Sequence, residues 1–116
     1  MFAFQRLKIY QLSKQLVLYN YKLVKKFPNE EKYALVQQMN RAAVSIPSNI
    51  AEGTSRRTNK DKAHFINISY GSLMELICQM EIAVELNYIT DNEFDKFSKM
   101  ARNLSVKMSN FVKTIS

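Results

Sequence analysis

The chain has 116 residues, of which 47% are hydrophobic, enough for one packed domain and too many for a disordered chain. Only two glycines and two prolines occur, too few for the many turns of a β-sandwich or barrel, so the composition favours long helices. The formal net charge of +7 favours polyanionic partners without specifying one.

The first predicted helix covers about residues 7–26, and Pro28 should end it because a proline ring does not fit a helix interior. Its apolar residues recur at alternating steps of three and four and share one face: Ile9, Leu12, Leu16, Tyr19, Leu23 and Phe27. Asn29 is placed to cap a second helix over about 30–55, with two glutamates at the positive end of its dipole.

Pro47 falls inside this second helix and would leave the carbonyl of Ala43 without its donor, at a cost of about 3 kcal/mol if nothing compensates. We therefore expect a kink. Five polar residues share the face opposite the apolar side chains: Arg41, Ser45, Ser48, Glu52 and Arg56. This face is either simply solvated, with Glu52 paired to an arginine, or directed at a partner, and periodicity alone favours the first reading.

A third helix is expected over about 59–87, capped by Thr58 or Asn59. Two apolar stripes run along it, the first through Ile66, Tyr70, Leu73, Ile77, Met80 and Val84. The second is displaced around the axis and holds Phe65, Ile68, Leu76, Ala83 and Leu86. A helix this apolar either lies at the bundle centre or meets another subunit. We predict an oligomer interface that includes Phe65, Ile68 and Leu76.

The fourth helix is expected over about 91–115. Asn87 can close the preceding helix in the left-handed conformation, and Thr90 with Glu93 forms a capping box. The apolar repeat that follows is typical of an antiparallel bundle seam: Phe94, Phe97, Ala101, Leu104, Met108, Phe111 and Ile115. The sequence therefore predicts a single all-α domain, an antiparallel up-and-down four-helix bundle whose second helix is kinked at Pro47.

A basic cluster lies where the second helix should give way to the third: Arg56, Arg57, Lys60 and Lys62. Flexible cations of this kind contact phosphates, although Asp61 lies among them and ordinary surfaces carry similar clusters. Charge is also uneven along the chain. Residues 1–29 hold six basic and no acidic residues, whereas three glutamates follow on the third helix, which indicates a polarised surface or contacts between copies.

Nothing in the sequence predicts catalysis, a metal or a cofactor. His64 is the only histidine and has no partner at catalytic or ligand spacing, so a hydrolase centred on it is the weakest hypothesis. Cys78 is the only cysteine, which excludes an internal disulfide. We expect it to be buried and inert, in a cytoplasmic protein without a membrane-spanning segment.

Residues 27–76 carry an unusual run of motifs. They comprise FP-x-EE-x-Y at 27–33, RAAVSIPSNIAEG at 41–53, R-x-x-x-K-x-x-x-x-F at 56–65 and GSL-x-EL at 71–76, with L-x-Y following at 86–88. Together with the first helix, this pattern closely resembles the four helix bundle protein family, also called the 23S rRNA-intervening sequence protein family. The resemblance covers about residues 4–95.

The resemblance implies a bacterial four-helix bundle that assembles into a barrel-like homopentamer and has no enzymatic activity. A similar relative, the accessory variability protein of diversity-generating retroelements, is a basic scaffold that binds nucleic acid and a reverse transcriptase. The family's basic positions correspond here to Arg41, Arg56, Arg57 and Lys60. Members often carry a basic pair before the AAVSIP run, whereas Asn40 precedes Arg41 here, which counts against phosphate binding at that turn.

The sequence and the resemblance together favour two functions. The first is a non-enzymatic, self-assembling scaffold that binds RNA or a ribonucleoprotein without sequence preference, through Arg41, Arg56, Arg57, Lys60 and Lys62. The second is a protein interaction module that docks an acidic protein partner and has no nucleic-acid role.

Overall fold

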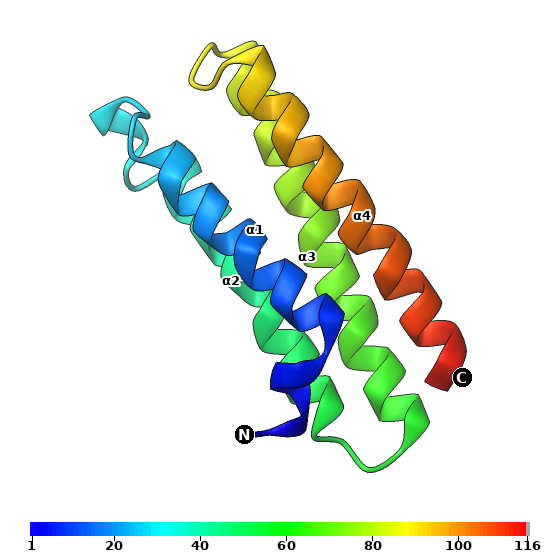
Figure 1. Ribbon diagram of the computed structural model, residues 1–116. Coiled ribbons are helices and arrows are strands. Elements are labelled where there is room, and N and C mark those ends of the chain that lie inside the picture. Colours follow the sequence, from blue (N-terminus) through cyan, green and yellow to red (C-terminus); the bar gives the residue numbers. More distant parts are fainter. Residues whose placement is uncertain (116) are drawn as a thin grey trace.

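The computed structural model describes residues 1–115 and consists of helices over that range (Figure 1). Its elements are η1 (Ala3–Arg6), α1 (Lys8–Val24), η2 (Asn29–Glu31), α2 (Leu35–Thr54), α3 (Asn59–Glu85) and α4 (Asp91–Ile115), where η marks a short 3-10 helix. Each long helix packs against the next and α4 packs back on α1, whereas α1 and α3 lie on the diagonal and their backbones do not come close. The predicted antiparallel up-and-down four-helix bundle is confirmed.

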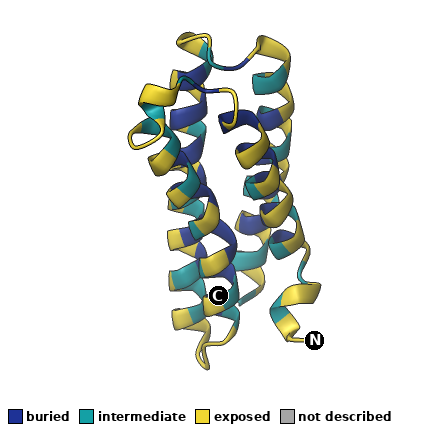
Figure 2. Cartoon of the chain, turned by 90° about the vertical axis from the view of Figure 1, so that its left-hand side faces the viewer, coloured by how far each residue is buried: buried dark blue, intermediate teal, exposed yellow. Residues whose placement is uncertain are grey.

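The buried residues lie on the inward sides of all four helices (Figure 2). Their side chains form one continuous core. The predicted stripes supply it, and its largest fully buried members are Leu16, Leu23, Met39, Ile46, Ile50, Ile66, Leu73, Leu76, Met80, Phe97, Leu104 and Met108. Four polar side chains are buried with this core: Ser13, Asn20, Ser69 and Gln79. The charged residues lie on the outer faces of the bundle and at its two ends.

Three helix ends predicted from the sequence are confirmed. The Thr58 hydroxyl accepts a hydrogen bond from the Asp61 amide at 3.1 Å and caps α3. Asn87 has a φ of 62°, the left-handed conformation that closes α3. Thr90 and Glu93 exchange the reciprocal bonds of a capping box, at 2.8 and 3.1 Å.

The start of the second helix differs from the prediction, because α2 begins at Leu35 and not near residue 30. The Glu31 carboxylate accepts a hydrogen bond from the Leu35 amide at 3.4 Å and a second from the Tyr88 hydroxyl at 2.7 Å. Glu31 is thereby held outside the helix against the α3–α4 connection. Asn29 opens only the short η2 turn.

Pro47 is buried inside α2 without ending it. Two neighbouring carbonyls gain side-chain donors: Asn49 Nδ2 donates to Ser45 O at 2.8 Å, and Ser69 Oγ of α3 donates to Ile46 O at 2.7 Å. These bonds strengthen the helix around the missing amide and tie it to α3. The kink stays a prediction, and the exposed Ser48 takes no part in these bonds.

Two expectations about α3 are wrong. Leu76 is fully buried in the core of a single chain and so cannot face another subunit, whereas Cys78 is exposed and not buried. The reason is that α3 packs against both α2 and α4, so both apolar stripes turn partly inward. The face left outside runs through Ile68, Gly71 and Cys78.

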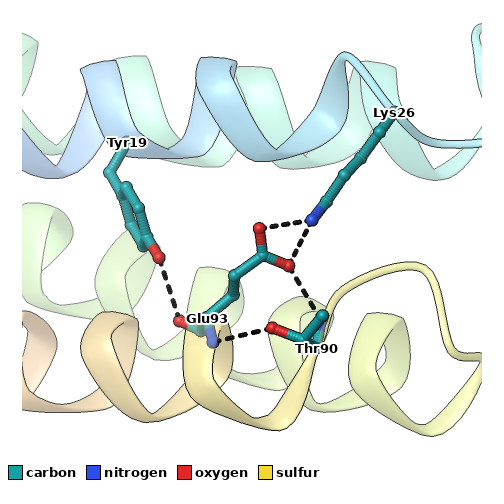
Figure 3. A network of polar contacts seen from close by, with 4 residues as sticks. All are labelled: Tyr19, Lys26, Thr90 and Glu93. Atoms are coloured by element: carbon teal, nitrogen blue, oxygen red, sulfur yellow. Dashed lines mark hydrogen bonds and ion pairs between the residues drawn. The ribbon is translucent and has the colours of Figure 1, made fainter.

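Polar contacts join the C-terminal end of α1 to the start of α4 (Figure 3). Lys26 Nζ donates to both carboxylate oxygens of Glu93, and the Tyr19 hydroxyl donates to the Glu93 carbonyl at 3.3 Å. The Lys26 ammonium and the Thr90 amide donate to this carboxylate and hold the pKa of Glu93 below its usual 4.5.

At Gly53, α2 lies very close to α3. A Cβ atom at this position would lie 2.9 Å from Cβ of Phe65 and 3.3 Å from the Lys62 carbonyl oxygen. Neither atom belongs to the mobile tip of a side chain, so any larger residue must push the helices apart. Gly53 thus sets where the α2–α3 connection lies.

Replacing Gly53 by alanine should destabilise the protein by about 1 to 3 kcal/mol, because the clash outweighs the gain in helix propensity. Gly71→Ala is the matched control: a Cβ there meets nothing within 4 Å, so the change should be neutral or stabilising by up to about 1 kcal/mol. Urea unfolding of both variants measures the difference. Equal effects of the two substitutions would contradict the close contact at Gly53.

Glu93→Gln should lower the free energy of unfolding at pH 7 by about 0.5 to 1 kcal/mol, since glutamine preserves the capping box but loses the ion pair. A carboxylate with a depressed pKa stabilises the fold above its unfolded pKa and loses this effect as the pH falls through the folded value. The gap between wild type and variant should therefore close below about pH 4.5, as followed by thermal unfolding. Asp95→Asn, which removes an exposed pair with Lys99, should show almost no gap at any pH.

Candidate nucleic-acid interface

The positive charge of the protein is concentrated at one end of the bundle. Antiparallel packing places Ser45 beside Ser72 and Asn20 beside Asn40, so residues 1–15, 45–72 and 106–115 form one half, which we call the basic half. This half contains only two acidic residues, Glu52 and Asp61, and nine basic ones: Arg6, Lys8, Lys14, Arg56, Arg57, Lys60, Lys62, Lys107 and Lys113. The other half has eight of each sign, so the basic half holds the entire net charge of +7.

Four predicted site residues meet at the α2–α3 connection within this half. Arg56 donates to a Glu52 carboxylate oxygen at 2.7 Å, and its guanidinium lies 4.5 Å from the centre of the Phe65 ring. The first contact confirms the expected pairing within the polar face of α2. The second orients the guanidinium at low entropic cost.

Arg57, Lys60 and Lys62 make no ion pair with any residue in the range 1–115. Arg57 and Lys60 are exposed, and Lys62 is half-buried beside Gly53. Asp61 contributes its backbone amide to the Thr58 cap. These three cations are therefore available to phosphates.

Arg41 does not belong to this cluster. It precedes Arg56 by 15 residues, which corresponds to about 22 Å along a helix. Its neighbour Asn40 accepts a hydrogen bond from Nδ2 of the fully buried Asn20 at 2.9 Å. Asn40, which stands where family members often have a basic residue, thus has a structural role because it joins α2 to α1. An arginine at this position could not accept the hydrogen bond from Asn20.

Several cations of the basic half were not predicted as site residues from the sequence. Lys8 on α1 and Lys107 on α4 line the same cleft of about 380 Å³, and Arg6 ends η1 nearby in the chain. The predicted topology is sufficient to place these cations at the same end of the bundle. In an up-and-down bundle the start of the first helix, the second connection and the end of the fourth helix lie at one end, as Figure 1 shows.

His64 is exposed and packs edge-on against Phe65, with ring centres 5.4 Å apart. Over residues 1–115 no group of three or more histidine, cysteine, aspartate or glutamate side chains is placed to hold a metal ion. None of the helices in the same range is long and apolar enough to cross a bilayer.

The outer faces of α3 and α1 differ in charge. The α3 outer face combines exposed apolar side chains with acids, namely Ile68, Met74, Cys78, Ile82, Leu86, Glu75, Glu81 and Glu85. The α1 outer face carries exposed Leu18 and Tyr21 among lysines, namely Lys14, Lys22 and Lys25. Since α1 and α3 are diagonal in the bundle, these faces point away from each other. Of the three predicted interface residues, Ile68 lies on the α3 outer face, Phe65 is half-buried under Arg56, and Leu76 is in the core.

Fold and charge together define a class: an antiparallel four-helix bundle with one basic end. The family model of the 23S rRNA-intervening sequence protein matches residues 5–110, and the chain belongs to that family. A crystal structure of a protein of unknown function from the S23 ribosomal protein family of Bacteroides thetaiotaomicron has the same fold. Its TM-score is 0.83 at 21% sequence identity, over 90% of this chain and 98% of that one. No curated protein matches the chain.

Proposed function

We propose that this protein is a non-enzymatic, cytoplasmic, self-assembling scaffold that binds RNA or a ribonucleoprotein through its basic half. The observation that carries the proposal is the concentration of the whole net charge of +7 in that half. Arg57, Lys60 and Lys62 form its centre, and Arg56, Lys8 and Lys107 extend it. Arg41 is a separate contact, reached only by a ligand that also runs along α2.

Binding of this kind has no sequence preference. The cations of the basic half are spread over helix ends and a short connection, which suits contacts to phosphates. Reading bases in a groove requires a helix or ribbon that presents several side chains to base edges. The basic half presents cations but no such helix or ribbon. Its affinity for nucleic acid should therefore depend steeply on salt.

The double variant Arg57→Glu with Lys60→Glu should abolish binding of single-stranded RNA at low salt, because it replaces two phosphate contacts by repulsion. Its matched control is Lys96→Glu with Lys99→Glu, which reverses two exposed lysines in the other half and should retain nearly full affinity. Fluorescence anisotropy over a salt series measures both. For the wild type, we expect a linear fall of log affinity with log salt.

The main alternative is docking of an acidic protein partner, which the same cations would serve. Wild-type protein that fails to bind RNA even at low salt would favour this alternative. Affinity that does not change with salt, or equal loss in both double variants, would contradict a phosphate site in the basic half.

We further propose that copies assemble head to tail, with the α3 outer face of one subunit against the α1 outer face of the next. Acids on the first face and lysines on the second are complementary, and both faces carry exposed apolar residues. Such head-to-tail contacts close into a ring when the rotation between successive copies adds up to a full turn, and we propose that they do so here. The family resemblance favours five subunits.

Ile82→Lys should break this ring, because it places a cation on the acidic, apolar α3 outer face opposite the lysines of α1. The expected sedimentation mass then falls from about five times to one times the 13.5 kDa of the chain. Val106→Lys, a similarly exposed position on α4, should leave the mass unchanged. A wild type that sediments as a single subunit at high concentration would rule out the ring.

A further inference from the structure

An aromatic ladder runs from Phe2 and Phe4, which precede α1, to Tyr10 in its first turn, and of the three only Tyr10 packs against the bundle core. Phe2 stacks on Phe4 with ring centres 6.1 Å apart and planes 11° apart, and Phe4 packs edge-on against Tyr10 at 4.9 Å. The Lys14 ammonium lies 5.4 Å from the centre of the Tyr10 ring. The ladder therefore joins α1 at one end and presents its last ring, Phe2, at the other.

Phe2 is 73% exposed although it is held in place. Its amide donates to the Gln5 side chain at 2.7 Å, and Gln11 of α1 donates to the Gln5 carbonyl at 3.2 Å. The η1 turn also packs against α2. An exposed aromatic ring on a fastened turn loses little conformational entropy when a ligand binds.

Beside the ladder is a hollow of about 450 Å³, which we call the Phe2 hollow. Phe2, Ala3 and Phe4 line one side, and the last turns of α2 line the other through Ala51, Thr54 and Ser55. Its walls are mainly aromatic rings and methyl groups. Arg56 and Arg57 follow Ser55 directly, so the hollow opens next to the centre of the basic half.

We propose that the Phe2 hollow receives an unpaired base of a single-stranded nucleic acid, which stacks on the Phe2 ring while its flanking phosphates contact Arg56 and Arg57. This inference rests on the proposed function and names its substrate class. Aromatic rings next to cations are the usual means of binding single strands, because every base has a flat face that stacks without sequence preference. In a duplex the bases are paired and stacked on each other, so Phe2 would contribute nothing.

The charges around the Phe2 hollow favour a nucleotide as its ligand. The ionic side chains next to the hollow in the chain are Arg6 on one side and Glu52, Arg56 and Arg57 on the other. The Glu52 carboxylate is already paired with Arg56, so the positive charge of Arg6 and Arg57 is left over. An apolar protein segment would fill the hollow but leave the positive charge of Arg6 and Arg57 unbalanced, whereas a nucleotide supplies a flat apolar ring and an anion together. An acidic peptide lacks the flat ring unless it happens to place an aromatic residue there.

The chain contains no tryptophan, so Phe2→Trp introduces a single fluorophore at the stacking position. Its emission should be quenched by oligouridine or oligothymidine and unchanged by a duplex of equal length or by inorganic polyphosphate. Tyr33→Trp is the matched control, an 80% exposed aromatic at the opposite end of the bundle whose emission should stay constant. Comparison of the two oligonucleotides distinguishes RNA from DNA as the ligand.

Phe2→Leu completes the test, since it keeps an apolar side chain and removes the ring. Affinity for the single strands should fall by about fivefold or more, and duplex affinity should not change. Salt-dependent binding of oligonucleotides without quenching, and with equal affinity of Phe2→Leu and wild type, would overturn the stacking site and leave the proposed function standing. Absence of any oligonucleotide binding at low salt would overturn both.

Discussion

The antiparallel packing of four amphipathic helices through one shared core is the constraint on which the rest of this structure depends. Short connections allow each helix to bury its apolar stripe only against its sequence neighbours, and α4 closes the bundle on α1. As a consequence the N-terminal turn, the α2–α3 connection and the last turns of α4 come together at one end (Figure 1). The basic half is a product of this topology, since no single segment of the chain contains it.

The two ends of the bundle are built differently. At one end, Lys26 pairs with Glu93 (Figure 3). The Tyr88–Glu31 hydrogen bond and the Phe27–Tyr88 ring contact also join the two connections there. At the basic end, the close approach at Gly53 positions the connection, but hollows remain beside η1 and between α1 and α4. The contacts at the neutral end support the fold, and the hollows at the basic end leave apolar and cationic groups accessible to a ligand.

Membership in the 23S rRNA-intervening sequence protein family is shown by the match over residues 5–110, and the related crystal structure supports the fold. Neither comparison identifies a ligand. The nucleic-acid proposal therefore rests on this chain's own charge distribution, and the proposed self-assembly rests separately on the α1 and α3 outer faces. In a ring built from those faces, the basic halves of neighbouring subunits lie side by side because α1 and α3 run parallel, which would extend the site along the rim.

The sequence by itself determined the helices, their caps at Thr58 and Thr90, the left-handed Asn87 and the up-and-down topology, because these depend on local periodicity and on short-range backbone hydrogen bonds. Only the tertiary structure decided which side of a helix remains outside: α3 packs against both α2 and α4, which buries Leu76 and exposes Cys78. It also decided that Asn40 joins α1 to α2 through Asn20, whereas the meeting of Arg6, Lys8 and Lys107 at one end already follows from the up-and-down topology. Charges distant in the chain become one surface only when the core has fixed where each helix begins and ends.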